Sequence, residues 1–237
     1  PASRCTLLHE TLAVDGASIG VERAGHILRA ATAGSADGAV GHSAPLVQRG
    51  VLSMPQCAAL RAVLGRYHHI AAEATEDLEL DFRLELSGPE LVAAVGADAA
   101  AAVVRSAAPL LATNGVAAPE SPRFVLRRTA ATPQGGNDEV ACIPFHTDAV
   151  HALASITLAD ESEYDGGRLV FVSADGRVRV PPRPAGSAVV LDASMTHAVT
   201  PLRRGCRSCL LVVWEAHGAE TDGGAGPFPH TIEELEA

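Results

Sequence analysis

The sequence predicts an α+β chain in which a helical N-terminal part precedes a mainly β half. Two segments, 53–70 and 90–111, carry apolar residues at helical spacing. From residue 124 to residue 214, short apolar runs alternate with turn residues about every ten positions, a pattern typical of an antiparallel sandwich or barrel. The length of 237 residues suits one large domain or two small ones.

Composition and charge exclude several classes of function. The formal net charge of -10 and the pI of about 5.4 disfavour nucleic acid as a partner, because binding a phosphate backbone requires a basic face. No apolar run reaches the roughly 18 residues that a membrane helix needs, so no membrane span is expected.

The cysteines and the first residue bear on the compartment. Five cysteines, an odd count, fit a reducing compartment such as the cytoplasm better than a disulfide scaffold. Cys206 and Cys209 form a lone CxxC, which we interpret as two small residues on opposite faces of a strand rather than as a redox or zinc motif. The chain begins at Pro1 without Met, which leaves open a trimmed or processed form that has lost a targeting segment.

The N-terminal half divides into an extension and two helical segments. Residues 1–45 are expected to form an extension with a short β-hairpin turning at Asp15-Gly16, or to be partly disordered. Ser53 is a suitable N-cap for the first helix, with Pro55 and Gln56 behind it. A strand with alternating apolar and charged residues follows at 78–86, and the second helical segment is expected to break at Gly96.

The β half is read as a series of short strands and turns. A polar loop at 133–139 precedes the first histidine motif and is a candidate lid. Residues 219–237 contain Gly-Gly, Gly-Pro and an acidic end, so we expect a loosely held C-terminal tail. Strands are predicted at 124–126, 153–158, 169–172, 178–180, 188–191 and 209–214.

Two histidines and one aspartate suggest a metal site. His146 and Asp148 are two apart on an extended segment, so their side chains point to the same side. His197, from a later strand, would complete a two-histidine, one-carboxylate set that leaves metal positions open, as in non-haem Fe(II) oxygenases. The simpler alternative is a surface turn with a capping aspartate. His151 is interpreted as a surface residue, with an alternative-ligand or pocket-base role as the second reading.

Arg207 is the third functional candidate. It follows His197 by ten residues in a short basic stretch. A guanidinium there is placed to bind a carboxylate with two parallel hydrogen bonds.

Four pieces then follow one another in a fixed order. They are His146-x-Asp148, Asp165-Gly166-Gly167-Arg168-Leu169-Val170-Phe171, Pro184-Ala185-Gly186-Ser187-Ala188-Val189-Val190-Leu191, and His197-Ala198-Val199-Thr200-Pro201-Leu202 with Arg207. Together they resemble the Fe(II)/2-oxoglutarate-dependent dioxygenases, in their prolyl 4-hydroxylase-like branch, over about ninety residues from Phe124 to Trp214. The resemblance implies a double-stranded β-helix (jelly-roll or cupin-like) with N-terminal support helices. It places a single domain at 46–218, with helical support at 46–120 and the β-helix core at 121–218, between the 1–45 extension and the 219–237 tail.

The resemblance also implies cofactors and further site residues. Fe(II) would be held by His146, Asp148 and His197, with 2-oxoglutarate and O2 in the remaining positions and ascorbate as reductant. Arg207 would pair with the distal carboxylate of 2-oxoglutarate, and Thr157 and Arg128 occupy positions where the family often has co-substrate tyrosines. Where the family often has a serine two residues after the basic residue, this chain has Cys209.

The leading functional hypothesis is therefore a hydroxylase that acts on a C–H bond of a peptidyl, proline-like substrate or of a small molecule, with release of succinate and CO2. The presence of Asp148 favours hydroxylation over halogenation, because halogenating relatives lack the carboxylate. Two alternatives remain: a catalytically silent β-helix protein that binds a ligand, and a cupin-like metal enzyme that does not use 2-oxoglutarate. The sequence carries no readable code for the substrate or the oligomeric state.

Overall fold

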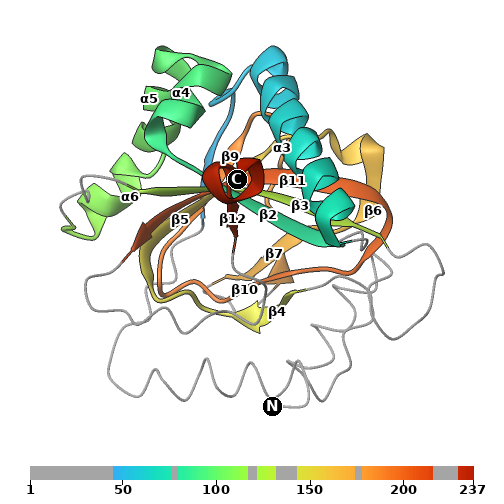
Figure 1. Ribbon diagram of the computed structural model, residues 1–237. Coiled ribbons are helices and arrows are strands. Elements are labelled where there is room, and N and C mark those ends of the chain that lie inside the picture. The colour runs from blue at the N-terminus through green and yellow to red at the C-terminus, as the bar shows by residue number, and fades with distance from the viewer. Residues whose placement is uncertain (1–44, 76–79, 117–121, 132–142, 174–177, 216–228) are drawn as a thin grey trace.

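Two β-sheets and a layer of helices make up the fold (Figure 1). The computed structural model describes residues 45–75, 80–116, 122–131, 143–173, 178–215 and 229–237. The expected N-terminal hairpin and the candidate lid lie outside the described residues. Among the described residues, no helix is long and apolar enough to cross a membrane.

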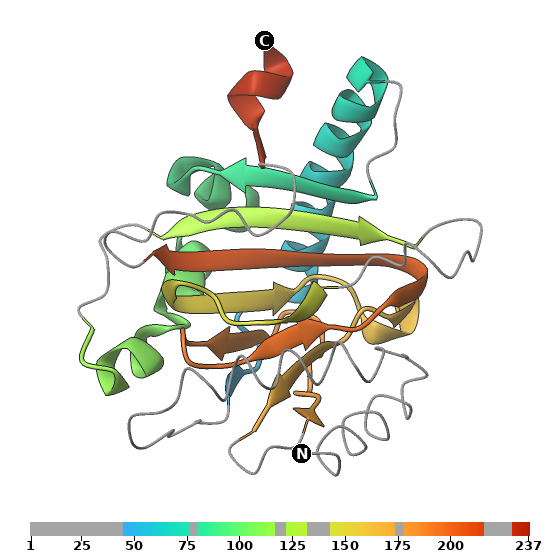
Figure 2. The same cartoon turned by 90° about the horizontal axis from the view of Figure 1, so that it is seen from below.

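The large sheet is eight-stranded and almost entirely antiparallel. Its main path runs β1-β9-β5-β11-β3-β2-β12, and β6 pairs with one end of β11. The long strand β11 is central, because β5 and β3 flank it on either side (Figure 2). Its members are β1 (Leu46–Gln48), β2 (Asp81–Leu86), β3 (Arg123–Ala130), β5 (Val150–Thr157), β6 (Tyr164–Gly166), β9 (Ala188–Leu191), β11 (Leu202–Glu215) and β12 (His230–Thr231).

The small sheet has four strands in the order β4-β10-β7-β8. These are β4 (Ile143–His146), β10 (His197–Val199), β7 (Leu169–Val172) and β8 (Val178–Arg179). It lies on the side of the large sheet away from the helices (Figure 1). An apolar cluster of Leu169, Met195 and Val199 with Val189 and Leu191 of β9 joins the two sheets. The arrangement is the double-stranded β-helix expected from the sequence, an α+β fold with a mainly β core.

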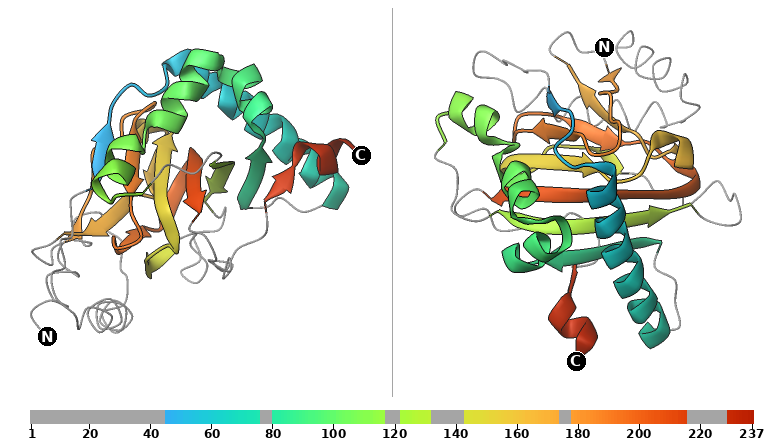
Figure 3. Two further views of the ribbon diagram at one scale, coloured as in Figure 1. Left: turned by 90° about the vertical axis from the view of Figure 1, so that its left-hand side faces the viewer. Right: turned by 90° about the horizontal axis from the view of Figure 1, so that it is seen from above.

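Helices cover the outer face of the large sheet (Figure 3). The first, α3 (Met54–Thr75), begins after Ser53, whose backbone N–H donates to the Gln56 side chain at 2.8 Å, as the sequence predicted. Its buried residues Leu60 and Leu64 join the main core cluster. Burying each such leucine stabilises the fold by about 2 kcal/mol.

The second helical segment is split into three. These helices are α4 (Gly88–Val95), α5 (Ala97–Arg105) and α6 (Ala108–Thr113). Gly96 has φ +86°, so the backbone leaves the right-handed helical region where the sequence predicted a break. Ser87 and Glu90 form a reciprocal capping box that starts α4.

The alternation of side chains along the strands separates the core from the site. On β11, Leu210, Val212 and Trp214 face the helices and belong to the main core. The alternate positions, which include Arg207 and Cys209, face the interior between the sheets. One strand therefore contributes to the stability of the fold with one face and to the candidate site with the other.

The chain end differs from the expected loose tail. Within residues 229–237, β12 pairs in parallel with β2, and α7 (Ile232–Glu236) follows it. Thr231 caps α7 through a capping box with Glu234. Ile232 and Leu235 pack against the main core, and Glu236 accepts a hydrogen bond from the Tyr67 hydroxyl of α3. The acidic composition predicted a solvent-exposed tail. The short helix also carries Ile232 and Leu235, however, and the edge of the sheet can bury these two apolar side chains.

Candidate metal and co-substrate site

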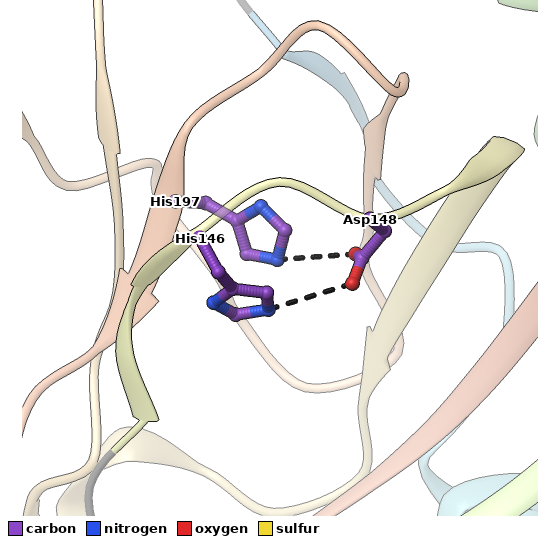
Figure 4. Close-up of side chains that lie close together, drawn as sticks. All are labelled: His146, Asp148 and His197. Carbon is purple, nitrogen blue, oxygen red and sulfur yellow. Dashed lines mark ion pairs between the residues drawn. The ribbon is translucent and has the colours of Figure 1, made fainter. Parts of the chain in front are cut away.

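The structure brings His146, Asp148 and His197 together in one cluster (Figure 4). Their candidate ligand atoms all lie within 4.8 Å of one another. Pairing of β4 with β10 sets His146 directly opposite His197, and their ring centroids are 4.4 Å apart. Asp148 follows β4 closely enough for its carboxylate to reach both rings. His151 is not a member of this group.

The carboxylate of Asp148 bridges the two imidazoles. Its Oδ1 lies 3.4 Å from Nε2 of His146, and its Oδ2 lies 3.3 Å from Nε2 of His197. Oδ2 is buried and has no hydrogen-bond partner of acceptable geometry. Three ligand atoms that converge while one buried oxygen stays unsatisfied fit a divalent cation, which would satisfy all three at once.

His197 is held in the tautomer that a metal ligand needs. Its Nδ1 lies 3.1 Å from the carbonyl oxygen of Met195, which can only accept a hydrogen bond. Nδ1 therefore carries the proton and Nε2 offers its lone pair toward Asp148. Burial lowers the pKa of His197 below its ordinary value, with Asp148 opposing the shift, so the ring is neutral at neutral pH.

Asp148 remains ionised despite its burial. Burial alone would raise its pKa, but the hydrogen bond from His146 and the electrostatic interactions with the His197 and His146 rings outweigh it, and the net pKa is lowered. A carboxylate beside neutral imidazole nitrogens is a hard, anionic donor set that suits Fe(II).

Arg207 lies in the interior, on the face of β11 that looks toward the small sheet. It is 5% exposed, and its Nε has no hydrogen-bond partner. Its side chain passes the Gly167 turn, where an added Cβ would lie 3.2 Å from its Cδ. Among the described residues, no carboxylate forms an ion pair with Arg207, so the guanidinium is available to an anionic ligand.

Thr157 shares this interior face. It pairs with Cys209 across β5 and β11, and paired residues point to the same side of a sheet. Thr157 is 1% exposed, and its hydroxyl has no hydrogen-bond partner among the residues that the structure describes. Thr157 therefore lies on the same face as Arg207, which is two residues from Cys209 on β11.

Arg128 is not brought to this site. It pairs with Phe82 of β2, a helix-facing residue, and its Nη1 lies 3.4 Å from Nε2 of His68 on α3. The interior positions of β3 are instead its neighbours Arg127 and Thr129. The physical reason is strand parity: a shift of one residue reverses the face to which a side chain points.

Sequence reasoning missed Arg183, which is buried like Arg207. It is 3% exposed, and its Nη2 donates to the hydroxyl of Ser155 at 3.0 Å. It stands among prolines 181, 182 and 184, where an arginine is expected to be exposed on a loop. No periodic pattern marks the residue as buried.

Comparisons with known proteins bear on the fold and on part of the chain. No family model matches. A PKHD-type hydroxylase of Cupriavidus metallidurans is 48% identical over 54 residues, which are 23% of this chain and 23% of that protein. The match therefore spans about a quarter of the length of the curated relatives.

Two solved structures share the fold. A prolyl 4-hydroxylase from Phytophthora capsici superposes with a TM-score of 0.53 at 15% identity, over 92% of this chain and 72% of that one. AviO1 from Streptomyces viridochromogenes gives 0.50 at 19% identity, over 90% and 100%. These structures confirm the double-stranded β-helix. The local identity to a PKHD-type hydroxylase agrees with the resemblance seen in the sequence, over those 54 residues.

Proposed function

We propose that this protein is an Fe(II)- and 2-oxoglutarate-dependent oxygenase that hydroxylates a C–H bond of a peptidyl, proline-like substrate or of a small molecule. The observation that carries the proposal is the convergence of His146, Asp148 and His197 at one point. Two features support it further. Arg207 lies in the same interior, where no carboxylate of the described residues pairs with it, and the matched relatives are named hydroxylases.

The three ligand residues have distinct roles in this proposal. His146 and His197 supply neutral nitrogens, and Asp148 supplies the negative charge that offsets part of the metal's charge. Fe(II) bound there would supply the activation of O2 that couples decarboxylation of 2-oxoglutarate, with succinate and CO2 as products, to hydroxylation of the substrate. The carbonyl of Met195 fixes the ring of His197, so the ligand set is ordered before the metal binds.

Arg207 and Thr157 would orient the co-substrate. A guanidinium can hold the distal carboxylate of 2-oxoglutarate with two hydrogen bonds, and the Thr157 hydroxyl can donate a third. The apolar side chains between the sheets exclude water from the region, which strengthens these charge-assisted contacts. Ascorbate is proposed as the reductant that keeps the metal in the ferrous state.

The experiment is a titration of 2-oxoglutarate into the wild-type protein by calorimetry under anaerobic conditions, with and without Fe(II). We expect Fe(II)-dependent binding, and we expect Arg207→Ala to abolish measurable binding. A metal enzyme of the cupin type that does not use 2-oxoglutarate would show no such binding and little effect of Arg207→Ala. A catalytically silent binding protein would show no Fe(II) binding at all, and either result would refute the proposal.

A further inference from the structure

Arg183 is a buried cation that forms no ion pair with any carboxylate in the described part of the chain. Its Nη2 donates to Ser155; among the described residues, its buried Nε finds no hydrogen-bond partner and no carboxylate lies within ion-pair distance of the guanidinium. An unpaired buried charge destabilises a protein strongly. A bound anion would pair with this guanidinium, and the described protein residues do not supply one.

The loop that carries Arg183 is held firmly against β5. The N–H of Gly186 donates to the carbonyl of Thr157 at 2.8 Å, and the N–H of Thr157 donates to the carbonyl of Ser187 at 3.0 Å. On the helix side, the N–H of Leu52 donates to the carbonyl of Gly186 at 3.0 Å. The position of Arg183 is therefore fixed by backbone contacts rather than by its own side chain.

Strand register places Arg207 and Ser155, the hydrogen-bond partner of Arg183, on either side of Thr157 on the interior face of the large sheet. Ser155, which holds Arg183, lies two residues from Thr157 on the same face of β5, about 7 Å along the strand. Thr157 lies opposite Cys209, and Arg207 is two residues from Cys209 on the same face of β11. Burial and the neighbouring charge of Arg207 lower the pKa of Arg183 to about 10, which leaves it charged at neutral pH.

Within the described part of the chain, three buried polar atoms of this region lack hydrogen-bond partners: Nε of Arg183, Nε of Arg207 and Oγ1 of Thr157. Two are cationic donors and one is a hydroxyl, so all three suit a carboxylate. We infer that Arg183 is a second anion-binding residue of the co-substrate pocket, and that the distal carboxylate of 2-oxoglutarate is held between the guanidiniums of Arg183 and Arg207. The inference rests on the proposed function and names a specificity-determining residue for it.

Two cations around one carboxylate make the pocket selective for dicarboxylic 2-oxo acids. A co-substrate without a distal carboxylate would leave both guanidiniums unpaired in the interior. The product succinate keeps one carboxylate that matches the pair, so it should bind the same spot.

The test compares binding of 2-oxoglutarate by calorimetry in the Mn(II)-loaded protein, where turnover does not interfere. Arg183→Gln is expected to weaken binding about 10- to 100-fold, because a hydrogen-bonded charge is lost. Arg183→Lys keeps the positive charge but cannot form two parallel hydrogen bonds, so its affinity for 2-oxoglutarate should lie between those of the wild type and Arg183→Gln. Arg66→Gln is the matched control, since it removes one exposed arginine on α3 whose guanidinium pairs with Glu236 and lies over the ring of Tyr67, and it should leave 2-oxoglutarate binding unchanged.

A stability measurement separates a binding role from a structural one. In the metal-free protein without 2-oxoglutarate, the urea midpoint of Arg183→Gln is expected to equal or exceed that of the wild type, because an unpaired buried charge has been removed. A lower midpoint with unchanged affinity for 2-oxoglutarate would overturn the inference and leave the proposed function intact. Failure of the wild type itself to bind 2-oxoglutarate would instead contradict the proposed function.

Discussion

Replacing Thr157 by valine should stabilise the free protein and weaken co-substrate binding. The hydroxyl is buried and unpartnered, whereas both backbone groups of Thr157 are satisfied by the 186–187 turn. Valine has nearly the same shape and the same preference for strands. A buried polar group without a hydrogen bond costs about 1–3 kcal/mol, so its removal should raise the free energy of unfolding by up to about 1 kcal/mol. Because a hydrogen bond to an anionic oxygen is lost, the affinity for 2-oxoglutarate should fall about tenfold or more.

The assay is urea denaturation of the metal-free protein together with calorimetric titration of 2-oxoglutarate. Thr200→Val is the matched control, because Thr200 is fully buried and its hydroxyl accepts a hydrogen bond from the N–H of Arg168 at 2.9 Å. The control should lose about 1–2 kcal/mol of stability. If Thr157→Val lost as much stability and bound 2-oxoglutarate as tightly as the wild type, the assignment of Thr157 would be refuted.

Two further predictions concern the framework of the site. Gly186→Ala should destabilise the fold by more than about 2 kcal/mol, because φ is +78° and the new Cβ would stand 2.0 Å from the carbonyl oxygen of Leu52; Gly65→Ala, on the exposed side of α3, should be neutral or stabilising in the same denaturation assay. Asp81→Asn should lower the unfolding free energy by about 1–3 kcal/mol at neutral pH, because Asp81 accepts two hydrogen bonds from Arg127 at 2.6 and 2.7 Å. Burial would raise the pKa of Asp81, but the arginine contacts lower it overall, so this stability is present above about pH 4 and is lost as the pH falls through the lowered pKa. The free energies of unfolding of the wild type and the Asn variant should therefore converge between pH 7 and pH 2. A difference that stays constant over this range would refute the stabilising role of the Asp81 charge.

Local patterns predicted the parts of this fold that depend on periodicity. The alternation of β2 gives its burial pattern directly, with Phe82, Leu84 and Leu86 in the core. Ser53 with Gln56 marked the start of α3, and the glycine at position 96 marked the end of α4, because these residue types favour a helix cap and a helix break. Spacing suggested that His146 and Asp148 share a side, because they are two apart on an expected extended segment, and the order of the later motifs added His197.

The missed features depend on tertiary pairing. β3 reads as a run of apolar and then basic residues without alternation, so its parity and the direction of Arg128 come only from pairing with β2 and β11. Arg183 gave no signal, because its burial depends on a turn fixed by Leu52 and Thr157, which are far away in sequence. The docking of α7 likewise depends on the edge of β2, which is formed more than a hundred residues earlier.

The most direct test of the central claim is succinate formation from 2-oxoglutarate by the purified protein with Fe(II), ascorbate and O2, measured beside His146→Ala. His146 has the most exposed side chain of the three, at 35%, and its replacement removes one of three converging ligands while leaving Met195 and His197 in place. The proposed function predicts slow succinate formation by the wild type, even without the prime substrate, and none by the variant. Equal succinate formation by both proteins, or its absence together with no Fe(II)-dependent binding of 2-oxoglutarate, would contradict it.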